Sequence, residues 1–195
     1  CAACGADARA LVCGRQVQGT AIALVSGADR GRGALDYAAA LDSVDGLVTD
    51  CPGLPLAIFV ADCVPIYLFD PRRRVVGLVH AGRAGTFRNI AGVAVRAMSD
   101  SYGSDASDVH ALIGPSAGSC CYEVSEEIVR EWQGAGMAVQ GRNLDLWASI
   151  VRQLADAGLP EQNVECAGIC TICQDRFFSY RRGDRMERNM ALLML

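Results

Sequence analysis

The 195-residue chain contains no lysine, and all 18 of its basic residues are arginine. Genomic base composition is a sufficient explanation for this bias, but the bias also has chemical consequences. A chain without lysine cannot form a lysine Schiff base with a substrate, and it cannot carry the lysine of a P-loop. The sequence therefore excludes two enzyme classes at once.

Histidine is also scarce, because the chain contains only His80 and His110. Multinuclear copper sites need many imidazole ligands, and two histidines cannot supply them. Any metal site in this chain must therefore also use cysteine or carboxylate. We interpret His110 as structural, since it lies within an apolar run after Asp108.

Several sequence signals of other protein classes are missing. No apolar run approaches the roughly 18 residues of a membrane-spanning helix, so we expect no membrane association. The HExxH pair of zincins and the GxGxxG loop of dinucleotide-binding proteins are both absent. The net charge is −4 and the arginines form no basic stripe, so we expect no nucleic-acid partner.

Ten cysteines are many for this length, but about one residue in twenty is below the level of disulfide scaffolds. We therefore expect reduced thiols and a cytoplasmic location. Cys170-x-x-Cys173, with Cys166 just before it, resembles a metal knuckle or a redox pair, although a single CxxC is a weak signal. Cys120 and Cys121 are a weaker signal still, because adjacent side chains in extended backbone point to opposite faces.

The order of elements predicts an α+β fold, a layered sandwich in which helices cover a mixed β-sheet. Length and composition predict one domain over residues 1–195, and the first residue, Cys1, suggests that an N-terminal segment is missing. Apolar patterning predicts strands at residues 10–13, 20–25, 45–49, 56–61, 66–69, 75–79, 109–113, 163–168 and 177–180. Helices are predicted at the end of 1–10 and over 35–41, 89–101, 123–132 and 144–157, and residues 181–195 are expected to close the sheet.

The region from Leu54 to His80 holds the most informative pattern. Three apolar runs follow one another, and residues 70–74 (DPRRR) predict a hairpin turn between the second and third. Cys63 lies at the start of one core strand and His80 at the end of the next. A thiolate and an imidazole can bind zinc or copper, or form an activated nucleophile. Spacing alone favours the alternative, a packed thiol and a core histidine.

Two glycine-rich segments precede predicted helices and could bind an anion at the helix N-terminus. The first runs from His80 to Thr86 (HAGRAGT) and includes Arg83 as an anion partner; the second begins at Gly114 (GPSAG). A plain helix start is the more frequent alternative for both segments.

Four separated segments together resemble the YfiH family. They read ADCVP (61–65), HAG (80–82), GP followed by CCYEV (114–124) and FFSYRR (177–182). Members of that family are described as multicopper polyphenol oxidase (laccase-like) proteins, as purine nucleoside phosphorylases with adenosine deaminase activity, or as peptidoglycan editing factors. The resemblance runs in order from about Arg15 to the C-terminus.

The resemblance implies a metal and catalytic trio, and this chain departs from it. The family places a histidine in a QVHG segment, the cysteine of ADCVP and the histidine of HAGWRGT. Cys63 and His80 match two of these, whereas the first histidine is replaced by Gln18 and the Trp-Arg pair by Arg83-Ala84. An amide oxygen is a much weaker zinc ligand than imidazole.

By this resemblance we expect a purine nucleoside phosphorylase or adenosine deaminase-type enzyme that takes a purine nucleoside and phosphate and uses a Cys/His zinc site. Two alternatives stay open: a metal-free pseudoenzyme or binding protein of the same fold, and an amidase that edits a peptidoglycan precursor. Copper oxidation is the least expected activity. The expected catalytic residues are Cys63, His80 and Asp62; the anion-binding residues are Arg83, Gly85, Thr86 and Arg181; the metal ligands are Cys63, His80 and the doubtful Gln18.

Overall fold

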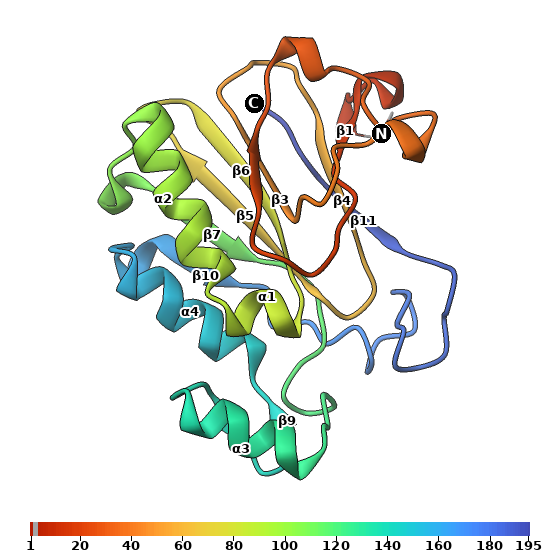
Figure 1. Ribbon diagram of the computed structural model, residues 1–195, viewed down its shortest axis with the longest axis vertical. Helices are drawn as coiled ribbons and strands as arrows, with labels where there is room; N and C mark the ends of the chain where they lie inside the picture. Colours follow the sequence, from red (N-terminus) through yellow and green to blue (C-terminus); the bar gives the residue numbers. More distant parts are fainter. Residues whose placement is uncertain (2–3) are drawn as a thin grey trace.

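The computed structural model describes residue 1 and residues 4–195, and its centre is a mixed six-stranded sheet (Figure 1). The sheet order is β10-β7-β5-β6-β3-β2. The β2–β3 and β7–β10 pairs are parallel and the other three pairs are antiparallel. The strands are β2 (Ile22–Leu24), β3 (Gly46–Thr49), β5 (Val64–Asp70), β6 (Val75–Ala81), β7 (His110–Ile113) and β10 (Val164–Cys166).

The predicted hairpin between β5 and β6 is confirmed. Asp70 pairs with Val75 at its closed end. The Asp70 carboxylate accepts the backbone N–H groups of Arg72 and Arg73 at 2.8 and 2.9 Å, which fixes the turn.

A second sheet of three strands has the order β1-β4-β11. It contains β1 (Val12–Cys13), β4 (Leu56–Val60) and β11 (Asn189–Leu193), and β11 runs antiparallel to β4. The three apolar runs between residues 54 and 80 therefore do not form one sheet, because β4 leaves β5 and β6 for the second sheet. A separate short pair is formed by β8 (Val139–Gln140) and β9 (Asn143–Leu144).

The helices are α1 (Arg83–Phe87), α2 (Ile90–Tyr102), α3 (Glu126–Gly134) and α4 (Leu146–Asp156). Within the part of the chain that the structure describes, 3₁₀ turns cover Ala8–Ala10, Gly27–Asp29, Tyr37–Ala39, Ala106–Asp108 and Glu161–Asn163. The Asn89 side chain caps α2 by accepting the N–H of Gly92, and Gly103 ends the helix with a φ of 66°.

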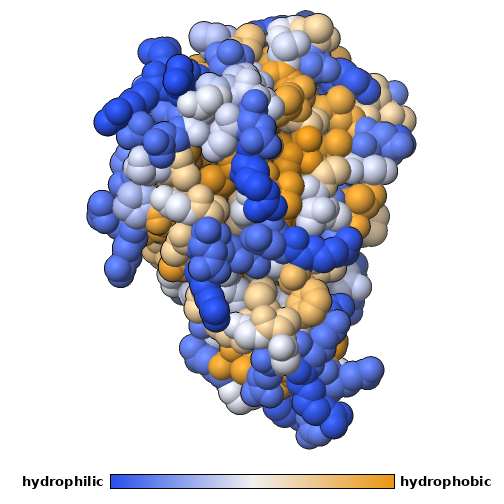
Figure 2. Space-filling model, turned by 60° about the vertical axis from the view of Figure 1, so that its left-hand side comes forward, coloured by the Kyte–Doolittle hydropathy of each residue, from blue (hydrophilic) through white to orange (hydrophobic). Residues whose placement is uncertain are grey.

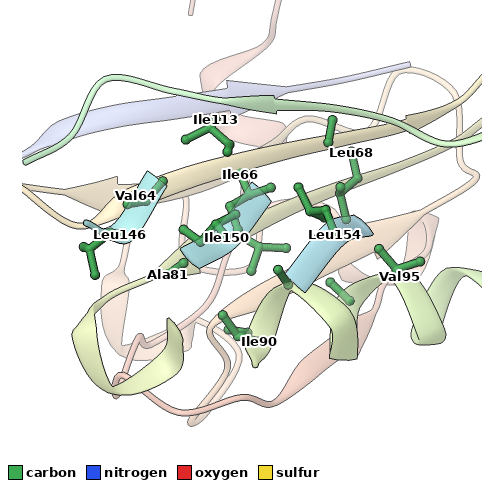
Figure 3. Packing of buried hydrophobic residues seen from close by; sticks show 14 of the residues in the cluster. Val64, Ile66, Leu68, Ala81, Ile90, Val95, Ile113, Leu146, Ile150 and Leu154 are labelled. Atoms are coloured by element: carbon green, nitrogen blue, oxygen red, sulfur yellow. The ribbon is translucent and has the colours of Figure 1, made fainter. Parts of the chain in front are cut away.

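Two apolar cores separate three layers, which confirms the predicted α+β fold. Helices α2 and α4 pack on one face of the six-stranded sheet, where residues such as Ile66, Val95 and Ile150 interlock (Figure 3). The three-stranded sheet covers the opposite face, and its Ile58 belongs to the same buried cluster as Leu78 of β6. The six-stranded sheet is therefore buried on both sides, which accounts for its nearly continuous apolar strands.

Helix α3 lies with β8 and β9 at the narrow end of the molecule (Figure 1). It turns Val129 and Trp132 inward. Its remaining face is polar, and hydrophilic side chains cover much of this end in Figure 2.

Three local predictions were wrong. Residues 177–180 form irregular backbone with a bend and a turn rather than a strand. The expected helix over 35–41 is a 3₁₀ turn at Tyr37–Ala39, and the expected helix tail in residues 1–10 is a 3₁₀ turn at Ala8–Ala10, with residues 2 and 3 outside the described part. Among the described residues, no helix has the length and apolar character needed to cross a membrane.

The layer arrangement predicts that Leu78→Ala destabilises the protein by about 2–5 kcal/mol, because Leu78 is fully buried between the two sheets. Urea unfolding followed by circular dichroism measures this change. Leu112→Ala is the matched control, since Leu112 is 40% exposed and its truncation should cost much less. Equal losses in the two variants would contradict the assigned layers.

Candidate active site

Cys63 and His80 meet at one end of β5 and β6, the two central strands of the six-stranded sheet, as expected. Cys63 directly precedes β5, and His80 of β6 pairs with Pro65 of β5. The histidine is 5% exposed and the cysteine is half-buried. The two side chains therefore share the end of one strand pair, with the thiol open toward solvent.

A buried carboxylate that we did not predict, Asp45, forms hydrogen bonds with several groups at this end of the two strands. Its Oδ1 lies 2.8 Å from His80 Nδ1 and accepts the Gln18 N–H at 2.9 Å. Its Oδ2 accepts the N–H groups of Val17 and Gly19 at 3.2 and 2.7 Å. One fully buried side chain thus holds both His80 and the loop that carries Gln18.

These contacts define the protonation of His80. Hydrogen bonding from His80 and from the backbone outweighs burial and lowers the pKa of Asp45, so Asp45 is a carboxylate that only accepts hydrogen bonds. In the neutral imidazole the single proton therefore sits on Nδ1 and Nε2 can accept a hydrogen bond or bind a metal, whereas the protonated ring donates from both nitrogens. Burial lowers the pKa of His80, but Asp45 and Cys63 outweigh it and raise the pKa to about 9.

In the metal-free chain, this shift also stabilises the fold. The pKa of His80 in the folded state is above its ordinary value of 6.5. The contribution of His80 to the free energy of unfolding is therefore complete below pH 6.5. It is lost as the pH rises through about 9.

Gly82 leaves open a space that Cys63 and Gln18 border. A Cβ atom placed on Gly82 would lie 3.2 Å from Cys63 Sγ and 3.2 Å from Gln18 Oε1. The sulfur and the amide oxygen thus border one space, and Cys63 also hydrogen-bonds the His80 ring. His80 has the carboxylate partner typical of a metal-binding histidine. The donor set fits a zinc ion with two strong ligands and one weak one.

Asp62, which we expected to be catalytic, has both carboxylate oxygens engaged in hydrogen bonds. Its carboxylate accepts Thr171 Oγ1–H and the backbone N–H of Arg181, both at 2.7 Å. Its carbonyl accepts the N–H of Ala117, and its φ is 78°. Since both carboxylate oxygens are engaged, we interpret Asp62 as a positioning residue that joins two loops beside Cys63.

The site opens into a cleft of about 800 Å³. Arg181 stacks on the ring of Tyr122 with its guanidinium carbon 4.6 Å from the ring centre, and burial, followed by the charge of Cys63, raises the pKa of that tyrosine. The cleft therefore combines positive charge with a protonated phenol. Its polar and aromatic lining comprises Gln16, Gln18, Tyr37, Phe59, Asp62, Cys63, His80, Arg83, Tyr122, Tyr180, Arg181 and Arg188.

The glycine-rich segments correspond only in part to the predicted anion sites. Arg83 opens α1 and lines the cleft, but Gly85 and Thr86 are buried in that helix and are not part of the lining described above. The segment from Gly114 does not lead directly into a helix, because α3 begins only at residue 126.

Gly114–Gly118 also has the Gly-x-Ser-x-Gly spacing of a nucleophile elbow. However, Ser116 is fully buried, donates to the Gly114 carbonyl and accepts from the Trp147 indole. The serine is therefore structural.

The structure also brings together two pairs of cysteines that are far apart in the sequence: Cys120 and Cys121, and Cys170 and Cys173. They lie close enough to hold a metal ion. Our reading of Cys120 and Cys121 was wrong because their backbone forms a turn, with the N–H of Cys121 bonded to the Gly118 carbonyl, rather than an extended strand.

The sequence reasoning missed Asp45 and Tyr122 as parts of the site. An acidic residue immediately before the buried strand β3 was the available signal for Asp45, since such a charge requires a partner. Tyr122 lay inside the CCYEV segment, but nothing in its spacing indicated the cleft.

Comparison with known sequences identifies a protein family and individual proteins that are similar to most or all of this chain. The profile of the family described as "Multi-copper polyphenol oxidoreductase laccase" matches residues 1–195. The protein named purine nucleoside phosphorylase YlmD of Geobacillus stearothermophilus is 39% identical over 184 residues, covering 88% of this chain and 66% of its own length. A purine nucleoside phosphorylase of Mycobacterium tuberculosis is 37% identical over 164 residues, covering 80% and 64%. The chain thus spans about two thirds of these curated relatives.

Solved structures share the fold. The Bacillus licheniformis hypothetical protein YfiH superposes with a TM-score of 0.91 at 35% identity, covering all of this chain and 77% of the other. YlmD from Geobacillus stearothermophilus gives a TM-score of 0.91 at 37% identity, covering 97% and 75%.

The contacts of Asp45 predict that Asp45→Asn lowers the pKa of His80 below its value of about 9, because the carboxylate is lost and burial is then opposed only by Cys63. Titration of the imidazole signals by NMR in metal-free protein measures this shift. Asp42→Asn is the matched control, since Asp42 is exposed and pairs with Arg15. An unchanged His80 titration in Asp45→Asn would contradict the described pair.

Proposed function

Because the chain belongs to the multi-copper polyphenol oxidoreductase laccase family and is similar to proteins named purine nucleoside phosphorylase, we propose that it cleaves purine nucleosides with phosphate. The observation that carries the proposal is the cleft itself. It joins the Cys63–His80 pair to arginines and aromatic side chains in one opening.

The cleft has the size and lining that a nucleoside needs. Its volume of about 800 Å³ lies within the range of small-molecule sites. Tyr37 and Phe59 pack edge-to-face with ring centres 6.1 Å apart and offer an aromatic wall for the base. Arg83 and Arg181 offer positive charge for a phosphate ion.

In phosphorolysis the bond between C1′ of the ribose and N9 of the base breaks, and its electron pair leaves with the base. A phosphate oxygen forms the new bond to C1′. In our proposal Arg83 and Arg181 bind and orient the phosphate, which is the main requirement for a displacement at C1′. The protonated Tyr122 hydroxyl donates a hydrogen bond to the departing base.

Cys63, His80 and the amide oxygen of Gln18 would hold a zinc ion beside this reaction centre. When bound, zinc would supply Lewis acidity toward developing negative charge. The Asp45 carboxylate keeps the proton of His80 on Nδ1 and so leaves Nε2 free to bind. Multinuclear copper does not fit this chain, since His110 lies in β7 and pairs with Phe69, away from His80.

We also propose a second reaction at the same site, the deamination of adenosine. There a water oxygen attacks C6 of the purine and the amino group leaves as ammonia. We further propose a reducing, cytoplasmic location, which the free state of all ten cysteines supports.

One observation favours the alternative function, a metal-free protein of the same fold that binds a ligand without catalysing a reaction. Gln18 stands where the resemblance places a histidine, and an amide oxygen is a weak zinc ligand. The amidase alternative would use the same Cys63–His80 pair, and no feature of the cleft favours it over nucleoside cleavage.

Purified protein should release hypoxanthine from inosine in the presence of phosphate. Cys63→Ala should lower kcat/KM by at least about 10²-fold, because the thiolate ligand is lost while the cleft remains. Chromatography of the free base and of ribose 1-phosphate measures the reaction, and adenosine run in parallel reports deamination. Cys166→Ser, at an exposed cysteine outside the cleft, is the control. Base release that is equal in Cys63→Ala and wild type, or absent from both, would overturn the proposal.

Gln18→His should increase zinc affinity and turnover by about tenfold or more, because an imidazole replaces a neutral amide oxygen. Isothermal titration with zinc and the same base-release assay measure the two effects. Gln18→Asn is the matched control, since it keeps an amide and should bring no gain. If zinc binding is unchanged in Gln18→His, Gln18 does not face the metal position.

A further inference from the structure

Four cysteine sulfurs from two distant loops form a compact cluster outside the Cys63–His80 pair. Cys120 and Cys121 lie in the loop after β7, and Cys170 and Cys173 lie in the loop after β10. All four Sγ atoms are within 4.8 Å of one another. Cys173 Sγ is 3.3 Å from Cys121 Sγ and 3.6 Å from Cys120 Sγ.

These separations correspond to a metal centre rather than to a disulfide. Zinc–sulfur bonds of about 2.3 Å in a tetrahedron place neighbouring sulfurs about 3.8 Å apart. A disulfide requires about 2.0 Å between its two sulfurs. All four cysteines are free, and the separations of 3.3 and 3.6 Å lie slightly below the tetrahedral value and well above a disulfide bond length.

The backbone is arranged to support thiolates at this position. The N–H of Gly118 points at the buried Cys170 Sγ from 3.3 Å. Backbone N–H groups directed at a sulfur stabilise its charged form, as the hydrogen-bonded surroundings of metal ligands do in general.

The cluster lies where the two loops are already joined. Ser116 and Cys170 form a parallel bridge, in which Ser116 N donates to the Ile169 carbonyl and Thr171 N donates to the Ser116 carbonyl. Asp62 also ties both loops, through Ala117 and Thr171. The four cysteines therefore lie beside hydrogen bonds that already connect the loop after β7 to the loop after β10.

Both loops supply walls of the cleft. Tyr122 directly follows Cys121 in the first loop. In the second loop the Arg182 side chain donates to the carbonyls of Thr171 and Gln174, next to Arg181 of the cleft lining. A bond between the loops at the cluster would thus restrain Tyr122 and Arg181 together.

We propose that Cys120, Cys121, Cys170 and Cys173 bind one zinc ion in a closed four-thiolate site that fastens the two loops forming the wall of the cleft. Four sulfur ligands in a tetrahedron, without an open position, are typical of structural zinc. The proposed zinc site does not depend on the proposed nucleoside chemistry being correct, because none of its four ligands is assigned to that reaction.

Zinc content in a Cys63→Ala/His80→Ala background tests the proposal, since this background removes the other candidate metal site. Elemental analysis by mass spectrometry should find one zinc per chain. Adding Cys170→Ser should abolish the zinc, whereas adding Cys166→Ser, at a neighbouring exposed cysteine outside the cluster, should retain it. Cobalt(II) added to the metal-free background should give the intense absorption of a tetrahedral thiolate site.

A second variant keeps the test decisive if Cys170→Ser fails to fold. Cys173→His replaces one thiolate by another zinc ligand, so it should retain the zinc and shift the cobalt spectrum, whereas Cys173→Ser should bind at least about tenfold more weakly. Three results would overturn the proposal: no zinc in the background protein, iron in its place, or a titration that finds two thiols fewer because a disulfide has formed. Loss of base release alone would not bear on it.

Discussion

The hydrogen bonds of one buried carboxylate, Asp45, hold the candidate site together. A fully buried charge is costly unless it is paired and hydrogen-bonded, and Asp45 satisfies this condition with three backbone N–H groups and the Nδ1 of His80. Its backbone carbonyl also accepts the N–H of His80 at 2.7 Å. The geometry of the imidazole and the position of Gln18 therefore depend on the same residue.

Asp62 has the corresponding role on the other side of Cys63. Its two oxygens hold Thr171 and the backbone of Arg181, and its carbonyl holds Ala117. The rigid hairpin of β5 and β6 carries Cys63 and His80, while long loops supply Tyr122 and Arg181. The proposed zinc of the four cysteines would restrain these loops, which otherwise depend on a small number of hydrogen bonds.

The sequence predicted the features that local patterns determine. These include the hairpin at Asp70, helix α2, which was expected over 89–101 and spans Ile90–Tyr102, and the meeting of Cys63 with His80 at neighbouring strands. Features that depend on distant partners were not predictable in this way. The pairing of β4 with β11, the contact of Asp45 with His80 across 35 residues and the grouping of Cys120 with Cys173 all arise from tertiary packing. The hydrogen bonds of Asp62 to Thr171 and Arg181, 109 and 119 residues away, likewise arise from tertiary packing and could not be read from its position beside Cys63.

A crystal structure of the protein soaked with inosine and sulfate, an unreactive substitute for phosphate, tests the central claim most directly. The account predicts the base along the aromatic wall, the sulfate on Arg83 and Arg181, and C1′ of the ribose directed toward Cys63 and His80. A nucleoside bound elsewhere on the molecule, with the cleft unchanged, would contradict the account.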